Sequence, residues 1–80
     1  MTEVARLRWL CRRGMKELDL LMQKYLDKHY PAAPEADQQA FQAILQMPDP
    51  DLYDLILQRT ESADPDITRV ITRLRGLIAA

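Results

Sequence analysis

The strongest constraint on the fold is the spacing of apolar residues in the C-terminal stretch "ITRVITRLRGLI". Apolar side chains recur there at intervals of three and four residues, which places them on one face of an α-helix. The same spacing recurs in the segments 18–25, 40–45 and 52–56. No segment alternates apolar and polar residues for long enough to predict a β-strand. The sequence therefore predicts an all-α fold.

The triplet "DPD" occurs at 49–51 and again at 64–66, each time just before an apolar stripe. Asp is favoured at a helix N-cap, Pro at the first helical position, and a second acid near the positive end of the helix dipole. The alternative, that these carboxylates bind a metal ion, lacks a third type of ligand nearby. Short connections favour packing between neighbouring helices. We expect a small antiparallel bundle of about five helices, at 3–12, 15–29, 35–47, 50–59 and 65–78, in a single domain spanning 1–80.

Composition limits the class of protein. A chain of 80 residues buries a modest core and has little room for a deep substrate cleft. Its single cysteine cannot form an internal disulfide, and neither a membrane span nor a signal peptide is recognisable, so we expect a cytoplasmic protein. Net charge is −1, but the segment 1–28 holds seven of the eleven Lys and Arg residues. This asymmetry predicts a basic patch at one end of the molecule.

The sequence contains no convincing catalytic set. His29 is the only histidine, and it lies at a predicted helix end, where interaction with the helix dipole explains it better than metal binding. Cys11 falls on the apolar side of the first helix and is expected to be a small buried hydrophobe. Nucleotide-binding and hydrolase motifs are not found in the sequence. We therefore expect that the chain is not an enzyme and binds neither a metal nor a cofactor tightly.

The first helix carries the only tryptophan, Trp9. Helical spacing places it opposite the apolar side, close to Arg6 and Arg13, with Arg12 somewhat further round. An exposed Trp among arginines is typical of protein interfaces. If the helix is short and irregular, Trp9 folds back onto the core instead. The apolar side of this helix consists of Val4, Leu7, Leu10 and Cys11.

A tight corner is expected between the first two helices. Gly14 is predicted at the C′ position of the first helix, with a positive φ. Glu17 and Asp19 fall in the first turn of the next helix, where the dipole favours acids. Arg13 and Glu17 are then expected to face each other. This pair could be an ordinary surface ion pair, or it could bind a partner.

The segment "RLRWLCRRGMKELD", at 6–19, resembles the SdhE family of FAD assembly (flavinylation) factors of succinate dehydrogenase. The core of the resemblance is the RGxxE motif, formed here by Arg13, Gly14 and Glu17. The segment "PDPDLYDLI", at 48–56, resembles the acidic turn that leads into the fourth helix of that family. The resemblance covers nearly the whole chain in length and helix order. Other matching residues are Trp9, Arg12, Met15, Leu18 and Asp19.

The resemblance implies a helical assembly factor, and we expect it to act as a monomer. Its partners would be the flavoprotein subunits of succinate dehydrogenase and fumarate reductase, and it would promote covalent attachment of FAD to a histidine of that subunit. FAD would be attached to the partner and not held tightly by this chain. The surface that binds the partner would include Arg6, Trp9, Arg12, Arg13, Gly14, Met15, Glu17 and Asp19. The alternative is a small helical nucleic-acid-binding domain that contacts phosphates through Arg6, Arg8, Arg12 and Arg13, although the acidic middle of the chain argues against it.

Overall fold

The computed structural model describes residues 2–78, and those residues form five α-helices and one short 3₁₀ helix. No strand occurs within this range, so the all-α prediction is confirmed. All five helices lie where the apolar pattern places them, with ends that differ by a few residues. The helices are α1 (Glu3–Leu10), α2 (Lys16–Lys28), α3 (Glu35–Leu45), α4 (Asp49–Ile56) and α5 (Pro65–Ile78), with the 3₁₀ helix η1 at Tyr30–Ala32.

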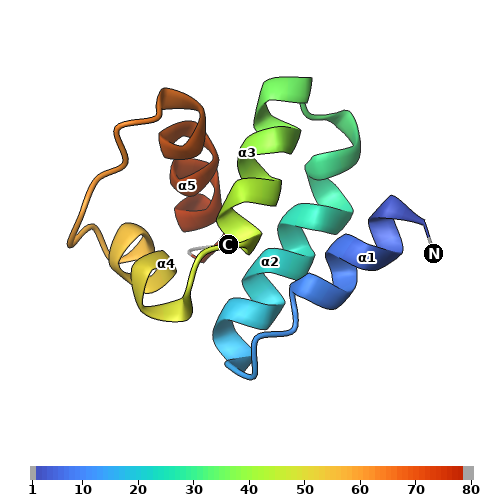
Figure 1. Cartoon of the computed structure of the whole chain (residues 1–80), viewed down its shortest axis with the longest axis horizontal. Coiled ribbons are helices and arrows are strands. Elements are labelled where there is room, and N and C mark those ends of the chain that lie inside the picture. The colour runs from blue at the N-terminus through green and yellow to red at the C-terminus, as the bar shows by residue number, and fades with distance from the viewer. Residues whose placement is uncertain (1, 79–80) are drawn as a thin grey trace.

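Helices α2 and α3 run in opposite directions and are joined by η1 (Figure 1). Helix α1 packs against both of them, and α5 packs against α2, α3 and α4. Helix α4 contacts α5 and lies at the far side of the molecule from α1 (Figure 1). The two tight corners, between α1 and α2 and between α3 and α4, lie at the same end of the bundle (Figure 1).

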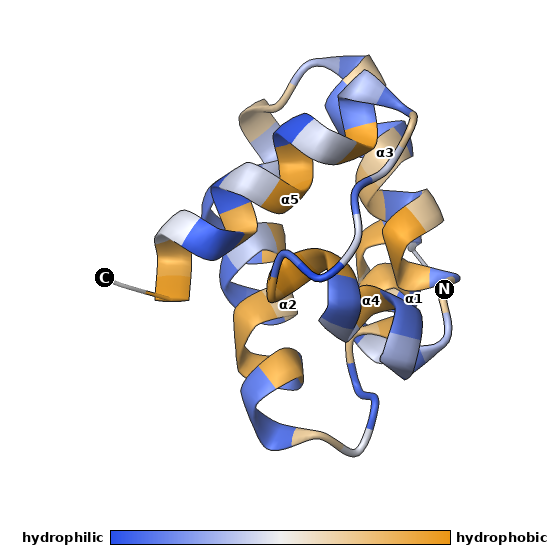
Figure 2. Cartoon of the chain, turned by 90° about the vertical axis from the view of Figure 1, so that its left-hand side faces the viewer, coloured by the Kyte–Doolittle hydropathy of each residue, from blue (hydrophilic) through white to orange (hydrophobic). Residues whose placement is uncertain are grey.

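The core is formed where the apolar stripes of the helices meet (Figure 2). Tyr25 of α2 and Phe41 of α3 are fully buried, with ring centroids 4.6 Å apart. Leu7 of α1, Leu52 of α4 and Leu74 of α5 are inaccessible to solvent. Each α-helix therefore contributes at least one fully buried side chain, and burial of this apolar surface is the main driving force for folding.

The two "DPD" triplets differ in their structure. At the start of α5, Asp64 precedes the helix and its Oδ1 accepts the backbone N–H of Asp66 at 2.8 Å, as predicted for an N-cap. At the start of α4, the cap position is occupied by Pro48, and Asp49 is already the first helical residue. The N-cap prediction for Asp49 is therefore wrong. Its carboxylate instead bonds a distant side chain, described below.

Helix α4 ends at Ile56, three residues before the predicted end. The chain leaves the helix through Gln58, which has a positive φ of 63°. The N–H of Arg59 donates to the carbonyl of Asp54 at 2.8 Å, and the N–H of Gln58 donates to that of Leu55 at 3.3 Å. This pair of bonds is the Schellman motif, which usually places Gly at the residue with positive φ.

Side-chain donors from α5 also bond the end of α4. The guanidinium of Arg75 donates to the carbonyl of Ile56 from Nε at 3.2 Å and to that of Leu55 from Nη2 at 2.9 Å. Carbonyls in the last turn of a helix have no partner within the helix, and a cation there is favoured by the dipole. Arg75 therefore joins the C-terminal end of α4 to α5.

The conformation of Gln58 predicts a stabilising substitution. Gln58→Gly should raise the free energy of unfolding by about 1 kcal/mol, because a left-handed conformation costs a residue with a Cβ roughly that amount. Gln46, the C-cap of α3, has a φ of −87° and is a matched control. Gln46→Gly should leave stability unchanged or lower it. Urea denaturation followed by circular dichroism measures both, and equal shifts would contradict the argument.

Candidate functional site

The corner between α1 and α2 contains the glycine of the RGxxE motif. Gly14 has a φ of +78°, as predicted, but it does not occupy the C′ position of α1. That helix ends at Leu10 with Cys11 as its cap, so Gly14 lies in the linker beyond it. A Cβ added to Gly14 would meet no atom within 4 Å. Glycine is thus required here for its backbone conformation, and the space beside it is open to a partner.

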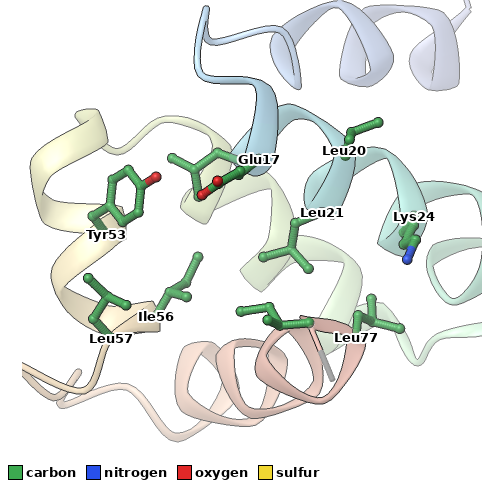
Figure 3. A pocket seen from close by; sticks show the side chains of 10 residues that line it. Glu17, Leu20, Leu21, Lys24, Tyr53, Ile56, Leu57 and Leu77 are labelled. Atoms are coloured by element: carbon green, nitrogen blue, oxygen red, sulfur yellow. The ribbon is translucent and has the colours of Figure 1, made fainter. Parts of the chain in front are cut away.

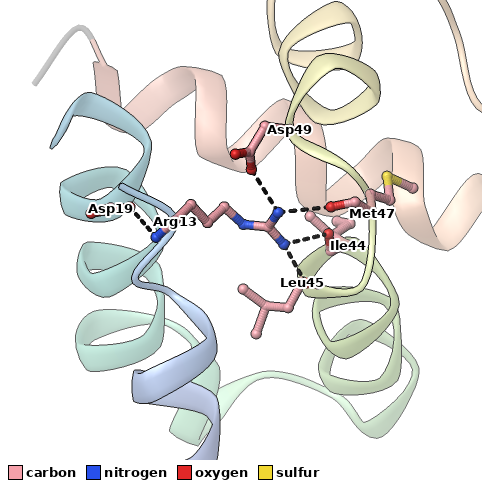
Figure 4. A network of polar contacts seen from close by, with 6 residues as sticks. All are labelled: Arg13, Asp19, Ile44, Leu45, Met47 and Asp49. Atoms are coloured by element: carbon pink, nitrogen blue, oxygen red, sulfur yellow. Dashed lines mark hydrogen bonds and ion pairs between the residues drawn. The ribbon is translucent and has the colours of Figure 1, made fainter. Parts of the chain in front are cut away.

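Arg13 turns inward and bonds the end of α3 (Figure 4). Its Nη1 donates to the carbonyl of Met47 at 2.7 Å and to Oδ1 of Asp49 at 2.8 Å. Its Nη2 donates to the carbonyls of Leu45 and, at 3.4 Å, of Ile44. Only 9% of the Arg13 side chain is exposed. The guanidinium therefore supplies donors and positive charge to carbonyls at the C-terminal end of α3.

The expected pair between Arg13 and Glu17 is wrong, and so is the placement of Arg13 beside Trp9. The carboxylate that pairs with Arg13 belongs to Asp49, 36 residues further along the chain. The backbone N–H of Arg13 donates to Oδ1 of Asp19 at 2.6 Å. Because α1 ends at Leu10, Arg13 is outside the helix and its side chain points toward α3 (Figure 4). Arg13 and Asp19 thus stabilise the corner from within.

Trp9 is 66% exposed on α1, which confirms the prediction that it faces solvent. It lines a shallow hollow together with Val4 and Arg12. Arg6 and Arg12 are also exposed. The outer surface of α1 therefore presents an aromatic side chain with arginines nearby, a composition that is enriched in protein interfaces.

The residues predicted to bind a partner fall into two sets. Those exposed on the surface are Arg6, Trp9, Arg12, Gly14 and Glu17. Those engaged within the fold or partly buried are Arg13, Met15 and Asp19. Met15 precedes α2 at its N-cap position and packs against the core.

Some arginines of the N-terminal segment are paired with carboxylates of the same chain. Arg8 bonds Asp27 of α2 at 2.5 Å, and Arg13 bonds Asp49. Two of the four arginines considered for nucleic-acid binding are thus paired with carboxylates of this chain. This pairing disfavours the nucleic-acid alternative, which depends on free cations.

The residues considered for chemistry occupy structural positions. Cys11 is fully buried, and burial raises the pKa of its thiol to about 11, so it is protonated at neutral pH and a poor nucleophile. His29 is the C-cap of α2, as expected for a residue at a helix end. Among residues 2–78, no group of three potential metal ligands comes together. Within the same range, no helix is both long and apolar enough to cross a membrane.

Sequence comparison shows the family to which these features belong. A family model, Sdh5, described as "Flavinator of succinate dehydrogenase", matches residues 5–78. The chain belongs to this family. The resemblance of the chain to this family is therefore confirmed.

Relatives described as "FAD assembly factor SdhE" match along most of their length. One from Shewanella oneidensis is 35% identical over 79 residues, covering 99% of this chain and 96% of the relative. One from Pseudomonas putida is 39% identical over 70 residues, covering 88% and 83%. One from Methylococcus capsulatus is 35% identical over 78 residues, covering 98% and 94%. The chain is therefore similar to these assembly factors over nearly their whole length.

Two features of this chain were not predicted from the sequence. The sequence predicts a helix cap at Asp49, and nothing local to Asp49 indicates that it binds Arg13. Three large apolar side chains, Leu20, Leu57 and Ile78, are exposed around a groove. A signal for Leu20 was present, because it lies off the stripe that includes Leu18 and Leu21.

The internal bonding of Arg13 predicts that it stabilises the fold. Arg13→Ala should lower the free energy of unfolding by about 3 kcal/mol, because Asp49 and the helix-end carbonyls lose their donors. Arg13→Lys should recover part of the loss, since it keeps the charge but not the forked geometry. Arg12→Ala, next to it and exposed, should change stability by less than about 0.5 kcal/mol. Chemical denaturation measures all three, and equal stability of the two alanine variants would contradict the assignment.

The exposure of Trp9 predicts its fluorescence. In the free protein, emission should be red-shifted and readily quenched by acrylamide. Adding the flavoprotein subunit of succinate dehydrogenase should shift the emission blue if Trp9 is buried on docking. Trp9→Ala should then weaken binding by roughly 2 kcal/mol with little loss of fold stability, while Trp9→Phe retains most of the affinity. An unchanged affinity in Trp9→Ala would remove this residue from the interface.

Proposed function

We propose that this chain binds the flavoprotein subunit of succinate dehydrogenase and promotes covalent attachment of FAD to it. We extend the proposal to the flavoprotein subunit of fumarate reductase, and to action as a monomer in the cytoplasm. Membership of the flavinator family and similarity to proteins described as FAD assembly factors support this role. The structural observation that carries it is the corner at Gly14, open on its outer side and close in sequence to exposed Trp9 and Glu17.

The contribution of the chain would be positional. When FAD is bound in the partner, the flavin supplies the carbon that is attacked, and a histidine of the partner supplies the nucleophile. Holding two reacting groups in attack geometry can remove much of an activation barrier without any catalytic group from the binding protein. This proposal is consistent with Cys11, whose buried thiol is protonated, and with His29, which caps a helix.

The residues of the corner would have two different roles, some holding the linker in place and others contacting the partner. The side chain of Arg13 ties the linker to the end of α3 and the start of α4. The carboxylate of Asp19 accepts the backbone N–H of Arg13 and so holds the linker against α2. Gly14 lets a partner backbone approach closely, because no side chain stands in the way. Glu17 is exposed in the first turn of α2 and can accept hydrogen bonds from the partner. The inner residues thus set the geometry of the outer ones.

The function is tested most directly at Gly14. Gly14→Arg should lower the free energy of unfolding by about 1–2 kcal/mol, because its φ of +78° strains a residue with a Cβ, but the protein should stay helical and folded, since the space beside Gly14 is open. In cells that lack the wild-type factor, it should abolish covalent flavin on the flavoprotein subunit. Gly14→Asn is the matched control, since Asn tolerates a positive φ and is short; it should retain much more activity. Covalent flavin is measured by in-gel fluorescence, and normal labelling with Gly14→Arg would refute the proposed docking at this corner.

We also propose that this chain does not hold FAD tightly by itself. Its 80 residues can hardly enclose a dinucleotide, and the sequence has no dinucleotide-binding turn. Titration of the purified protein with FAD by calorimetry should show no tight stoichiometric binding. A submicromolar dissociation constant would contradict this proposal and would favour a role as a flavin carrier.

A further inference from the structure

An apolar groove runs between α2, α4 and α5, with Glu17 of the RGxxE motif at its edge (Figure 3). Its volume is about 430 Å³. Helix α2 forms one wall, α4 the second and the end of α5 the third (Figure 3). The site described above uses only Glu17 of this groove, so the remaining lining has no role in it.

The groove combines a buried floor with an exposed apolar rim. Leu18, Leu21 and Ile56 belong to the core and are almost inaccessible. The rim is formed in part by Leu20, Leu57 and Ile78, which are 54%, 50% and 60% exposed. Large apolar side chains gathered around a hollow are costly to hydrate, and such patches mark binding surfaces.

Two opposite charges are placed along the α2 wall. Glu17 and Lys24 both line the groove and are seven residues apart on α2, which separates them by about two helical turns, or roughly 10 Å. An occupant that pairs with both Glu17 and Lys24 needs a cationic and an anionic group that are also roughly 10 Å apart. On a helix, residues seven positions apart lie on one face at this spacing. The charges therefore specify the chemistry of the occupant and which of its two charges lies at each end of the α2 wall.

We propose that this groove receives an amphipathic helix of the flavoprotein subunit. The helix would place an apolar stripe against the rim, a Lys or Arg at Glu17, and an Asp or Glu at Lys24. Binding of a helix in a groove through such a stripe is a common mode of recognition. The inference rests on the proposed function and names the part of the partner that reaches beyond the Gly14 corner.

A helix of the partner fits the groove better than a second copy of this chain. The groove is concave, and a symmetric dimer across it would place one hollow against another. Apolar rims would then meet around an enlarged empty space, which loses packing contacts. A separate helix is convex and can fill the hollow, so the shape and the pair of charges favour the same occupant.

The first test adds a charge to the rim. Leu57→Asp should weaken binding to the purified flavoprotein subunit of succinate dehydrogenase at least tenfold, as measured by calorimetry. Its melting temperature should stay close to that of the wild type, because the side chain is half exposed. Ala36→Asp adds the same charge at an exposed position of α3, which does not line the groove, and should bind normally.

The second test identifies the occupant. A photoreactive amino acid at position 57 should cross-link to a partner segment that has an apolar stripe. The same segment should carry a basic and an acidic residue seven positions apart, in either order along the chain. Lys24→Glu should weaken binding severalfold, and changing that partner acid to Lys should restore it. A cross-link to a segment without this pattern would overturn the proposed chemistry.

The outcomes separate this inference from the proposed function. If Leu57→Asp binds normally while Gly14→Arg does not bind, the groove is not used and the proposed function stands. If the wild type fails to bind the flavoprotein, both proposals fail. If sedimentation shows that the wild type self-associates and Leu57→Asp does not, with flavoprotein affinity unchanged, the groove serves a second copy and the inference is overturned.

Discussion

The bonding of Arg13 to the end of α3 is the interaction on which the rest of the structure depends. It joins the corner between α1 and α2 to the corner between α3 and α4, two places 31 to 36 residues apart in sequence. Asp49 completes the arrangement by pairing with the guanidinium at the first residue of α4. A small core alone fixes helix faces but not the ends of helices. Here a single side chain joins two helix ends, the last turn of α3 and the start of α4, to the linker that contains Gly14.

The same device is used again at α4, where Arg75 of α5 bonds the last carbonyls. Helices of 8 to 14 residues have a large share of their backbone groups at their ends. In a chain of 80 residues, few other elements can cover those groups. Arginine suits this task, because its donors are fixed in a planar fork and its charge is favoured at the negative end of the helix dipole. Part of the arginine content is therefore structural and not a surface for anions.

Much of the fold could be predicted because it depends on local patterns. Apolar spacing placed all five helices, and the cap at Asp64 and the positive φ at Gly14 follow from the preferences of single residues. The pairing of Arg13 with Asp49 could not be found in this way, since it requires knowing which corners meet in space. The decisive error was to extend the helical spacing of the first helix as far as Arg13. Helix α1 ends at Leu10, so Arg13 lies in the linker and not on a helix face. Trp9 lies within α1, so helical spacing predicts its exposure. Arg13 lies beyond the end of α1, so helical spacing does not predict its neighbours.

The division of the RGxxE motif into an inner and an outer residue has a consequence in the cell. Arg13 is bonded within the fold, whereas Glu17 is exposed. Loss of the first would deplete the pool of folded protein, since a loss of a few kcal/mol exposes a marginally stable chain to proteases. Loss of the second would leave the pool intact and, under the proposed function, would weaken the binding of each molecule to its partner. Overproduction or a lower growth temperature would then rescue one defect and not the other, although both arise within five consecutive residues and would give the same phenotype in an ordinary genetic screen.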